Sequence, residues 1–326
     1  MPIEQVIYGL AVPAVLAMAG LLLARRPRRN GLRPIVPLAP IASVDTLPRV
    51  LGHAAAEPVS GRARLRMPAG GIAPGCAMAV AYVLGHLLLM GRPERPLEPW
   101  HWLPVLALAA AGLSILYVVG RVSIWPRRVL DGSLYAVALV LLLRPAPLNT
   151  WDRGRAGWWL AGLWLGLMVF TRLMHRLARR VRGATLAGVM MVAGTAGGIV
   201  LVCSSNARLG QLAGVLTAAT GGAFVSGLLR PEMSFSGGGV RVTTLLLAAL
   251  LVLGYFNDYT ELPAMMFPLV AAAPLAAWVG QLPPIRRLRP WQRFTARIVA
   301  VLIPAAISAA IAWRTYQSVA RWDEAY

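Results

Sequence analysis

The sequence predicts an all-α protein, a polytopic bundle of about ten transmembrane helices. Its 326 residues are 58% hydrophobic and 13% charged, whereas a soluble domain is roughly half apolar and a quarter charged. Ten mostly apolar stretches follow one another along the chain, most of them about 20 residues long, which is enough to cross a hydrocarbon core. This composition excludes a soluble globular enzyme and a disordered chain, and two cysteines exclude a disulfide scaffold.

Most of the predicted spans are separated by short loops, so we expect one integral membrane domain over residues 1–326. The eighth span is the shortest, and a total of eight or nine spans is the alternative if one segment is re-entrant. In chain order, the predicted spans cover residues 3–23, 71–91, 101–120, 129–147, 157–175, 184–204, 208–229, 241–256, 262–282 and 296–316.

The arginines predict the orientation of these spans. All 32 basic residues are arginine, and 24 of them fall in loops on one side, with four of the twelve acids. The other side holds eight arginines and eight acids, so the whole net charge of +20 lies on one face. Basic residues accumulate on cytoplasmic loops, which predicts N- and C-termini outside. The Ala-, Leu-, Gly- and Pro-rich, lysine-free composition indicates a high-GC bacterium, and hence a multi-pass protein of the bacterial cytoplasmic (inner) membrane.

The first span, residues 3–23, is interpreted as an anchor rather than a cleaved signal peptide, because arginines follow it directly. It leads into the one long loop, at about 24–70, which is predicted to be cytoplasmic and too short to bury its own core. The loop is interpreted as a solvated linker, and a docking surface is the alternative. Anionic lipid headgroups on the cytoplasmic face are the expected partners; nucleic acid is not, because the basic runs directly flank spans.

The second span carries His86 and Cys76. His86 is interpreted as a histidine hydrogen-bonded across a helix interface, and a proton relay, a metal ligand or a general base is the alternative interpretation. Cys76 and Cys203 fall near opposite membrane faces, too far apart for a disulfide. No zinc-site spacing links the histidines and cysteines, so no metal, cofactor or catalytic residue is predicted.

The third to fifth spans carry few polar residues. Asp131, near the inner end of the fourth span, is the carboxylate expected to lie deepest. Gly162 and Gly166 in the fifth span have the small-residue spacing that lets helices approach closely. Trp164 is the one tryptophan expected well inside a span.

The sixth and seventh spans are predicted to form a tight helical hairpin, with only residues 205–207 between them. Pairs of glycines four residues apart, at Gly194/Gly198 and Gly210/Gly214, favour close packing of the two helices. The alternative is a substrate-lining pair. Its candidate ligand-lining residues are Thr195, Asn206, Gln211 and Thr217.

The ninth span contains Pro263, Pro268 and Pro274, which predict a kinked helix, because proline removes a backbone donor. Asp258 and Glu261 precede it as an outer acidic cluster, a further candidate for ligand binding. An ordinary acidic loop is the competing interpretation.

Three functions fit this pattern. The first is a permease-like protein that moves a small neutral or lipidic solute, although no mid-depth carboxylate is present to couple ions. The second is a non-catalytic membrane subunit that docks partner subunits through its arginine-rich face. The third, an outer-leaflet enzyme, is the least favoured, because no lipid-enzyme signature is found.

Overall fold

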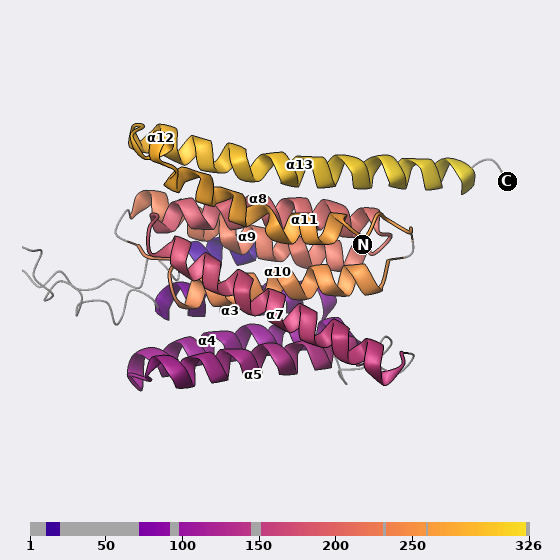
Figure 1. Ribbon diagram of the computed structural model, residues 1–326, viewed down its shortest axis with the longest axis horizontal. Coiled ribbons are helices and arrows are strands. Elements are labelled where there is room, and N and C mark those ends of the chain that lie inside the picture. Colours follow the sequence, from indigo (N-terminus) through magenta and orange to yellow (C-terminus); the bar gives the residue numbers. More distant parts are fainter. Residues whose placement is uncertain are drawn as a thin grey trace, which may run out of the picture.

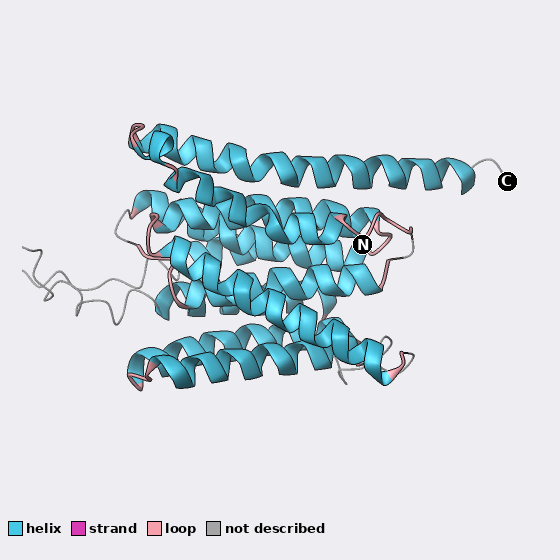
Figure 2. Cartoon of the chain, viewed as in Figure 1, coloured by secondary structure: helices cyan, strands magenta, loops and turns pink. Residues whose placement is uncertain are grey.

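The computed structural model describes residues 11–19, 72–91, 98–144, 151–230, 233–258 and 260–323, all as helices and connecting loops without a strand (Figure 2). Seven of the described helices are long and apolar enough to cross a membrane. They coincide with the predicted second, third, fifth, sixth, seventh, eighth and tenth spans, which confirms an all-α, multi-pass architecture. The 24–70 loop and most of the first predicted span lie outside the described residues.

Most of the helices are long, and 3₁₀ segments extend two of them, η3 with 4 residues and η4 with 9. In chain order they are α3 (Ile72–Met90), η3 (Pro99–Trp102), α4 (Leu103–Val119), α5 (Ile124–Leu143), α7 (Arg153–Ala178), α8 (Gly183–Cys203), α9 (Ala207–Leu229), α10 (Gly238–Phe256), α11 (Met266–Ala272), η4 (Ala273–Gln281), α12 (Pro283–Arg286) and α13 (Pro290–Asp323). Residues 11–19 are helical as well.

The helices lie roughly side by side, with α10 in the middle, α13 along one edge, and α4 and α5 along the opposite edge (Figure 1). Helix α10 is the most buried of the seven, and its neighbours include α3, α4, α7, α9 and α11. One end of the bundle holds α12 and the α4–α5 and α7–α8 connections, and we call it the arginine-rich end. Its exposed arginines include Arg121, Arg128, Arg180, Arg182 and Arg286. We call the opposite end the far end.

Helix α5 occupies the predicted fourth span but begins five residues earlier than expected. Its first two turns carry Arg127, Arg128 and Asp131, so it is not among the seven apolar helices. The sequence pattern placed the arginines in a loop because charge is costly in a membrane. Helix α5 nevertheless includes Arg127 and Arg128. Its N-cap Ser123 is extended, and the helix begins at the next residue, Ile124, at the end of the bundle.

The predicted ninth span is a broken helix. Helix α11 ends at Ala272, and the chain continues as the 3₁₀ helix η4, with Pro274 in its first turn. Pro274 has no N–H to donate to the Val270 carbonyl four residues earlier, so the α-helical hydrogen-bond pattern is interrupted at this residue. The α-helix predicted for the ninth span is therefore interrupted near Pro274, and a bend of its axis stays a prediction.

Helices α8 and α9 form the predicted hairpin and share the most extensive contact in the described structure. A Cβ atom at Gly194 would lie 2.7 Å from the Thr217 hydroxyl, and one at Gly198 would lie 3.6 Å from the Ala213 Cβ. The turn is closed by Ser205, whose φ of 58° is left-handed. The glycines therefore allow α8 and α9 to pack closely, as the sequence predicts.

Candidate functional site

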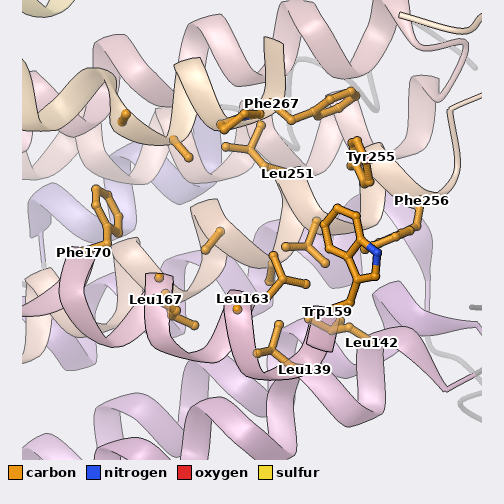
Figure 3. A pocket seen from close by; sticks show the side chains of 18 of the residues that line it. Leu139, Leu142, Trp159, Leu163, Leu167, Phe170, Leu251, Tyr255, Phe256 and Phe267 are labelled. Atoms are coloured by element: carbon orange, nitrogen blue, oxygen red, sulfur yellow. The ribbon is translucent and has the colours of Figure 1, made fainter. Parts of the chain in front are cut away.

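An apolar chamber of ≈ 570 Å³ is bounded by α5, α7, α10, α11 and η4 (Figure 3). Leucines at 139, 142, 163, 167 and 251 point into it together with aromatic rings (Figure 3). In the described structure no charged side chain lines it. The side-chain polar atoms of its lining are the Trp159 indole nitrogen and the Tyr255 hydroxyl.

Glycines on α7 leave the space that becomes the chamber. Gly162 and Gly166 both line it, and a Cβ atom at either position would meet no described atom within 4 Å. The prediction that this pair mediates close packing is therefore wrong. Gly75 shows the contrast, because its Cβ would lie 2.6 Å from the Gly238 Cα, where α3 and α10 touch. A glycine thus leaves open space on α7 and allows close helix contact on α3.

The chamber opens sideways, between α7 and α11. Its lining includes exposed residues on both sides: Gly162 and Gly166 of α7, Pro268 of α11, and Met265 directly before α11. Met265 is 62% exposed. The two glycines lie in the middle of the apolar stretch Gly154–Ala178. An opening at this depth would face acyl chains rather than water in a membrane.

An aromatic cluster closes the far end of the chamber. The Tyr255 and Phe256 rings are 4.8 Å apart, the Trp159 and Phe256 rings 5.7 Å, and the Tyr255 and Phe267 rings 5.7 Å. All four residues line the chamber (Figure 3). Edge-to-face contacts of this kind are a favoured packing geometry of aromatic rings, and they stabilise this wall.

Beyond the other end of the chamber lies a buried polar cluster. The Arg241 Nε on α10 donates to Asp131 Oδ1 on α5 at 2.8 Å, and its Nη1 donates to Ser114 Oγ on α4 at 2.6 Å. The Arg241 guanidinium also lies over the Tyr117 ring, 4.6 Å from its centroid, and the Tyr117 hydroxyl donates to Asp131 at 3.0 Å. The Arg241 side chain is only 6% exposed. The cluster therefore ties α4, α5 and α10 together.

A layer of threonines separates this cluster from the chamber. The Thr171 and Thr244 hydroxyls are 3.4 Å apart, and they join α7 to α10. Their chain neighbours, Phe170 and Leu245, line the chamber. From the apolar chamber toward the arginine-rich end, the threonine pair therefore comes first and the Arg241–Asp131 ion pair second.

The ion pair is the site feature that sequence reasoning missed. The predicted eighth span begins at Arg241, which assigns this arginine to the cytoplasmic loop, yet α10 begins three residues earlier and buries it. The available signal was that Asp131 and Arg241 are opposite charges at the same ends of two spans. An acid expected to lie deep in a membrane implies a nearby base.

The candidate residues of the hairpin do not line the chamber. Thr195 and Thr217 donate their hydroxyls to carbonyls one turn back on their own helices, at 3.0 and 2.9 Å. Asn206 caps α9, where its Oδ1 accepts from the Leu209 N–H at 3.2 Å. Gln211 lies one turn further along α9 and is half-buried.

Asp258, the first of the two acids before α11, stabilises its own loop. Asp258 accepts hydrogen bonds from the Thr260 N–H and hydroxyl at 3.0 and 2.9 Å, and from the Leu262 N–H at 2.7 Å. The same Thr260 hydroxyl lies 2.9 Å from the Cys203 carbonyl, which links this loop to the end of α8. Glu261 is exposed and has a left-handed φ of 53°.

His86 is buried in α3 with 1% of its surface exposed, beside the Tyr82 ring at 6.2 Å. Neither of its ring nitrogens has a hydrogen-bond partner among the described residues. None of the seven candidate residues lines the chamber, and they do not gather into one site. No group of three or more His, Cys, Asp or Glu side chains suited to a metal occurs in the described ranges.

Comparison with known proteins adds no family to this picture. No protein-family model matches the sequence, and no curated protein matches it either.

Proposed function

We propose that this chain is a permease-like protein of the bacterial cytoplasmic membrane that binds and moves a lipidic solute. The observation that carries the proposal is the apolar chamber, which opens sideways at the depth of the spans. Its volume of ≈ 570 Å³ falls in the usual range of about 300–1,000 Å³ for small-molecule sites.

The chemistry of the lining favours a lipidic solute over a small polar one. A polar group buried without a hydrogen-bond partner loses about 1–3 kcal/mol. The chamber offers two polar side-chain atoms, both near its far end, so a polar solute would lose most of its hydrogen bonds there. A hydrocarbon or isoprenoid chain loses none, and it can enter directly from the membrane between α7 and α11.

Movement of the solute requires a wall that changes shape, and α11–η4 supports this role. Long 3₁₀ segments have poorer hydrogen-bond geometry than α-helices and often mark hinges. The break at Ala272–Ala273 lies beside the chamber, because Ala271, Ala272 and Leu275 all line it. The threonine pair and the Arg241–Asp131 ion pair form the barrier toward the arginine-rich end.

The proposal includes the topology that the arginines predict, with about ten spans and both termini outside. In that topology α5 and α11–η4 would serve as the fourth and ninth spans. The arginine-rich end would face the cytoplasm and attract anionic headgroups. Roles for His86, Asp258 and the other candidate residues in ligand binding stay predictions.

Reconstitution into liposomes tests the proposal. Protein-containing vesicles with a fluorescent lipid in both leaflets should expose the inner-leaflet label to a membrane-impermeant quencher faster than protein-free vesicles do. The Gly166→Leu variant, which fills the chamber, should lower this rate toward that of protein-free vesicles. A rate that is equal with and without protein, for phospholipid and isoprenoid probes alike, would contradict transport.

Docking of a partner subunit is the second candidate function, and the exposed arginines at the arginine-rich end favour it. Purification from native membranes separates the two candidates. Stoichiometric co-purification of another protein through this face would favour the subunit reading, whereas a bound lipid without protein partners would favour the permease.

A further inference from the structure

Two adjoining hollows lie at the arginine-rich end, apart from the chamber. Their volumes are ≈ 510 and ≈ 490 Å³, and they share Arg180, Arg293 and Arg297. Arg180 follows α7, whereas Arg293 and Arg297 lie on the first two turns of α13. Arg286 of α12 lines the second hollow as well. Guanidinium groups from three segments thus converge on one place.

These arginines have no acidic partner in the described structure. Among the residues that the structure describes, no Asp or Glu lines either hollow. The ion pairs among the described residues are Arg208–Glu98 and Arg241–Asp131, and neither involves this cluster. Like charges held together without a counter-charge repel one another, so a bound anion would stabilise the arrangement.

Arg297 is the strongest sign of a built site, because it is a cation with only 9% of its surface exposed. Its Nη2 donates to the Gly280 carbonyl at 3.3 Å, whereas its Nε is buried and has no partner among the described residues. The Arg293 Nε and the Gln281 Nε2 are buried and unpartnered in the same way. A buried donor without an acceptor is costly, so three of them at one place indicate a missing acceptor.

Neighbouring residues hold these groups in position. Gly280 packs directly on the Arg297 side chain, and a Cβ there would lie 2.7 Å from Arg297 Cγ. The Arg180 guanidinium lies over the Trp278 ring, 5.3 Å from its centroid. Packing therefore holds Arg297 and Arg180 in position within the site.

We infer that this arginine site binds a phosphate group. A planar guanidinium group donates two parallel hydrogen bonds to two oxygens of a phosphate. Several guanidinium groups together match the charge of a phosphate better than the charge of a single carboxylate. The first hollow adds an apolar side, formed by Val181, Leu228, Phe294 and Trp291, and Trp291 is 63% exposed. A phosphate with a hydrocarbon chain beside it would fill both hollows, which favours a lipid phosphate from the leaflet at this end.

This inference goes beyond the proposed function, because the arginine site lies at the arginine-rich end and shares no residue with the chamber. It also differs from a diffuse attraction of basic loops to anionic membranes, because it requires particular arginines. Arg286 lines the second hollow, whereas Arg287, the next residue, lines neither. Both are exposed, so this pair provides a matched comparison.

The test uses the full-length protein in detergent and native mass spectrometry with three probes: a short-chain phosphatidic acid, the diacylglycerol with the same chains, and inorganic phosphate. Phosphatidic acid should bind in a one-to-one complex, and diacylglycerol should bind far more weakly. Arg286→Gln and Arg297→Gln should each weaken phosphatidic acid binding by about tenfold or more, because each removes charge-assisted hydrogen bonds. Arg287→Gln should leave binding within about twofold of the unmodified protein.

The outcomes separate the alternatives. Competition by inorganic phosphate at similar concentrations would identify a soluble phosphate as the occupant, and binding of phosphatidic acid alone would identify a lipid headgroup. Equal losses for Arg286→Gln and Arg287→Gln would show diffuse attraction and overturn the inference, as would equal binding of diacylglycerol. Arg286→Gln keeps the test valid if Arg297→Gln fails to fold, and liposome transport by Arg286→Gln shows whether the proposed function stands independently.

Discussion

Filling the chamber with Gly166→Leu separates binding from stability. A Cβ at Gly166 meets no described atom within 4 Å, so leucine should fit without moving the backbone. Glycine inside a helix is less stable than other residues by about 0.5–1 kcal/mol. The variant should therefore unfold at the same temperature as the unmodified protein or at a higher one.

The binding loss follows from the volume that leucine occupies. Its side chain adds four carbons, and each methylene of a ligand buried from water contributes about 0.8 kcal/mol. Excluding about four ligand methylenes should cost about 3 kcal/mol, or on the order of a hundredfold in affinity. The assay is a titration with a fluorescent short-chain fatty acid below its micelle concentration, with the melting temperature measured in parallel.

Gly157→Leu is the matched control, because Gly157 also lies on α7 with open space around its Cβ but does not line the chamber. It should bind the probe like the unmodified protein. Equal affinity of all three proteins would refute the chamber as the binding site. A large drop in the melting temperature of Gly166→Leu, without a drop for Gly157→Leu, would contradict the open space beside Gly166.

Three further predictions concern stability. Asp131→Asn should lower the stability by about 3–5 kcal/mol, because it leaves Arg241 buried without its counter-charge, and the melting temperature in detergent should fall. Glu98→Gln breaks an exposed ion pair and should change the melting temperature little. Equal shifts for the two variants would contradict the burial of the Arg241–Asp131 pair. Gly75→Val should abolish the monodisperse peak in size-exclusion chromatography, because the added atoms overlap the facing backbone of α10, and an unchanged profile would contradict that contact. Asp258→Ala should cost about 1–3 kcal/mol in denaturant unfolding, because three hydrogen bonds within its loop are lost, whereas a preserved midpoint would indicate that they contribute nothing.

Much of the fold could be predicted because membrane spans are long and apolar. The hairpin of α8 and α9 followed from the three residues between two apolar stretches and from its glycine spacing. The break in the ninth span followed from Pro274, since a missing N–H acts locally. The start of α5 could not be predicted, because hydropathy penalises Arg127 and Arg128 whether they are helical or not.

The site could be predicted much less well, because it depends on how helices meet. Gly166 and Gly75 both lie within predicted apolar spans, yet one lines a cavity and the other touches a neighbouring helix. Arg241 and Arg297 read as topology signals, and only the packing of α10 and of η4 shows that both are buried. Thr195 is a candidate ligand-lining residue by residue type alone, and its hydroxyl donates to a carbonyl of its own helix.

The most direct test of the chamber as a lipid site is native mass spectrometry of the protein released gently from its own membranes. The account predicts a defined lipid mass retained by the unmodified protein and by Gly157→Leu, and lost from Gly166→Leu. Retention of the same lipid by Gly166→Leu, or no retained lipid in any of the three proteins, would contradict it.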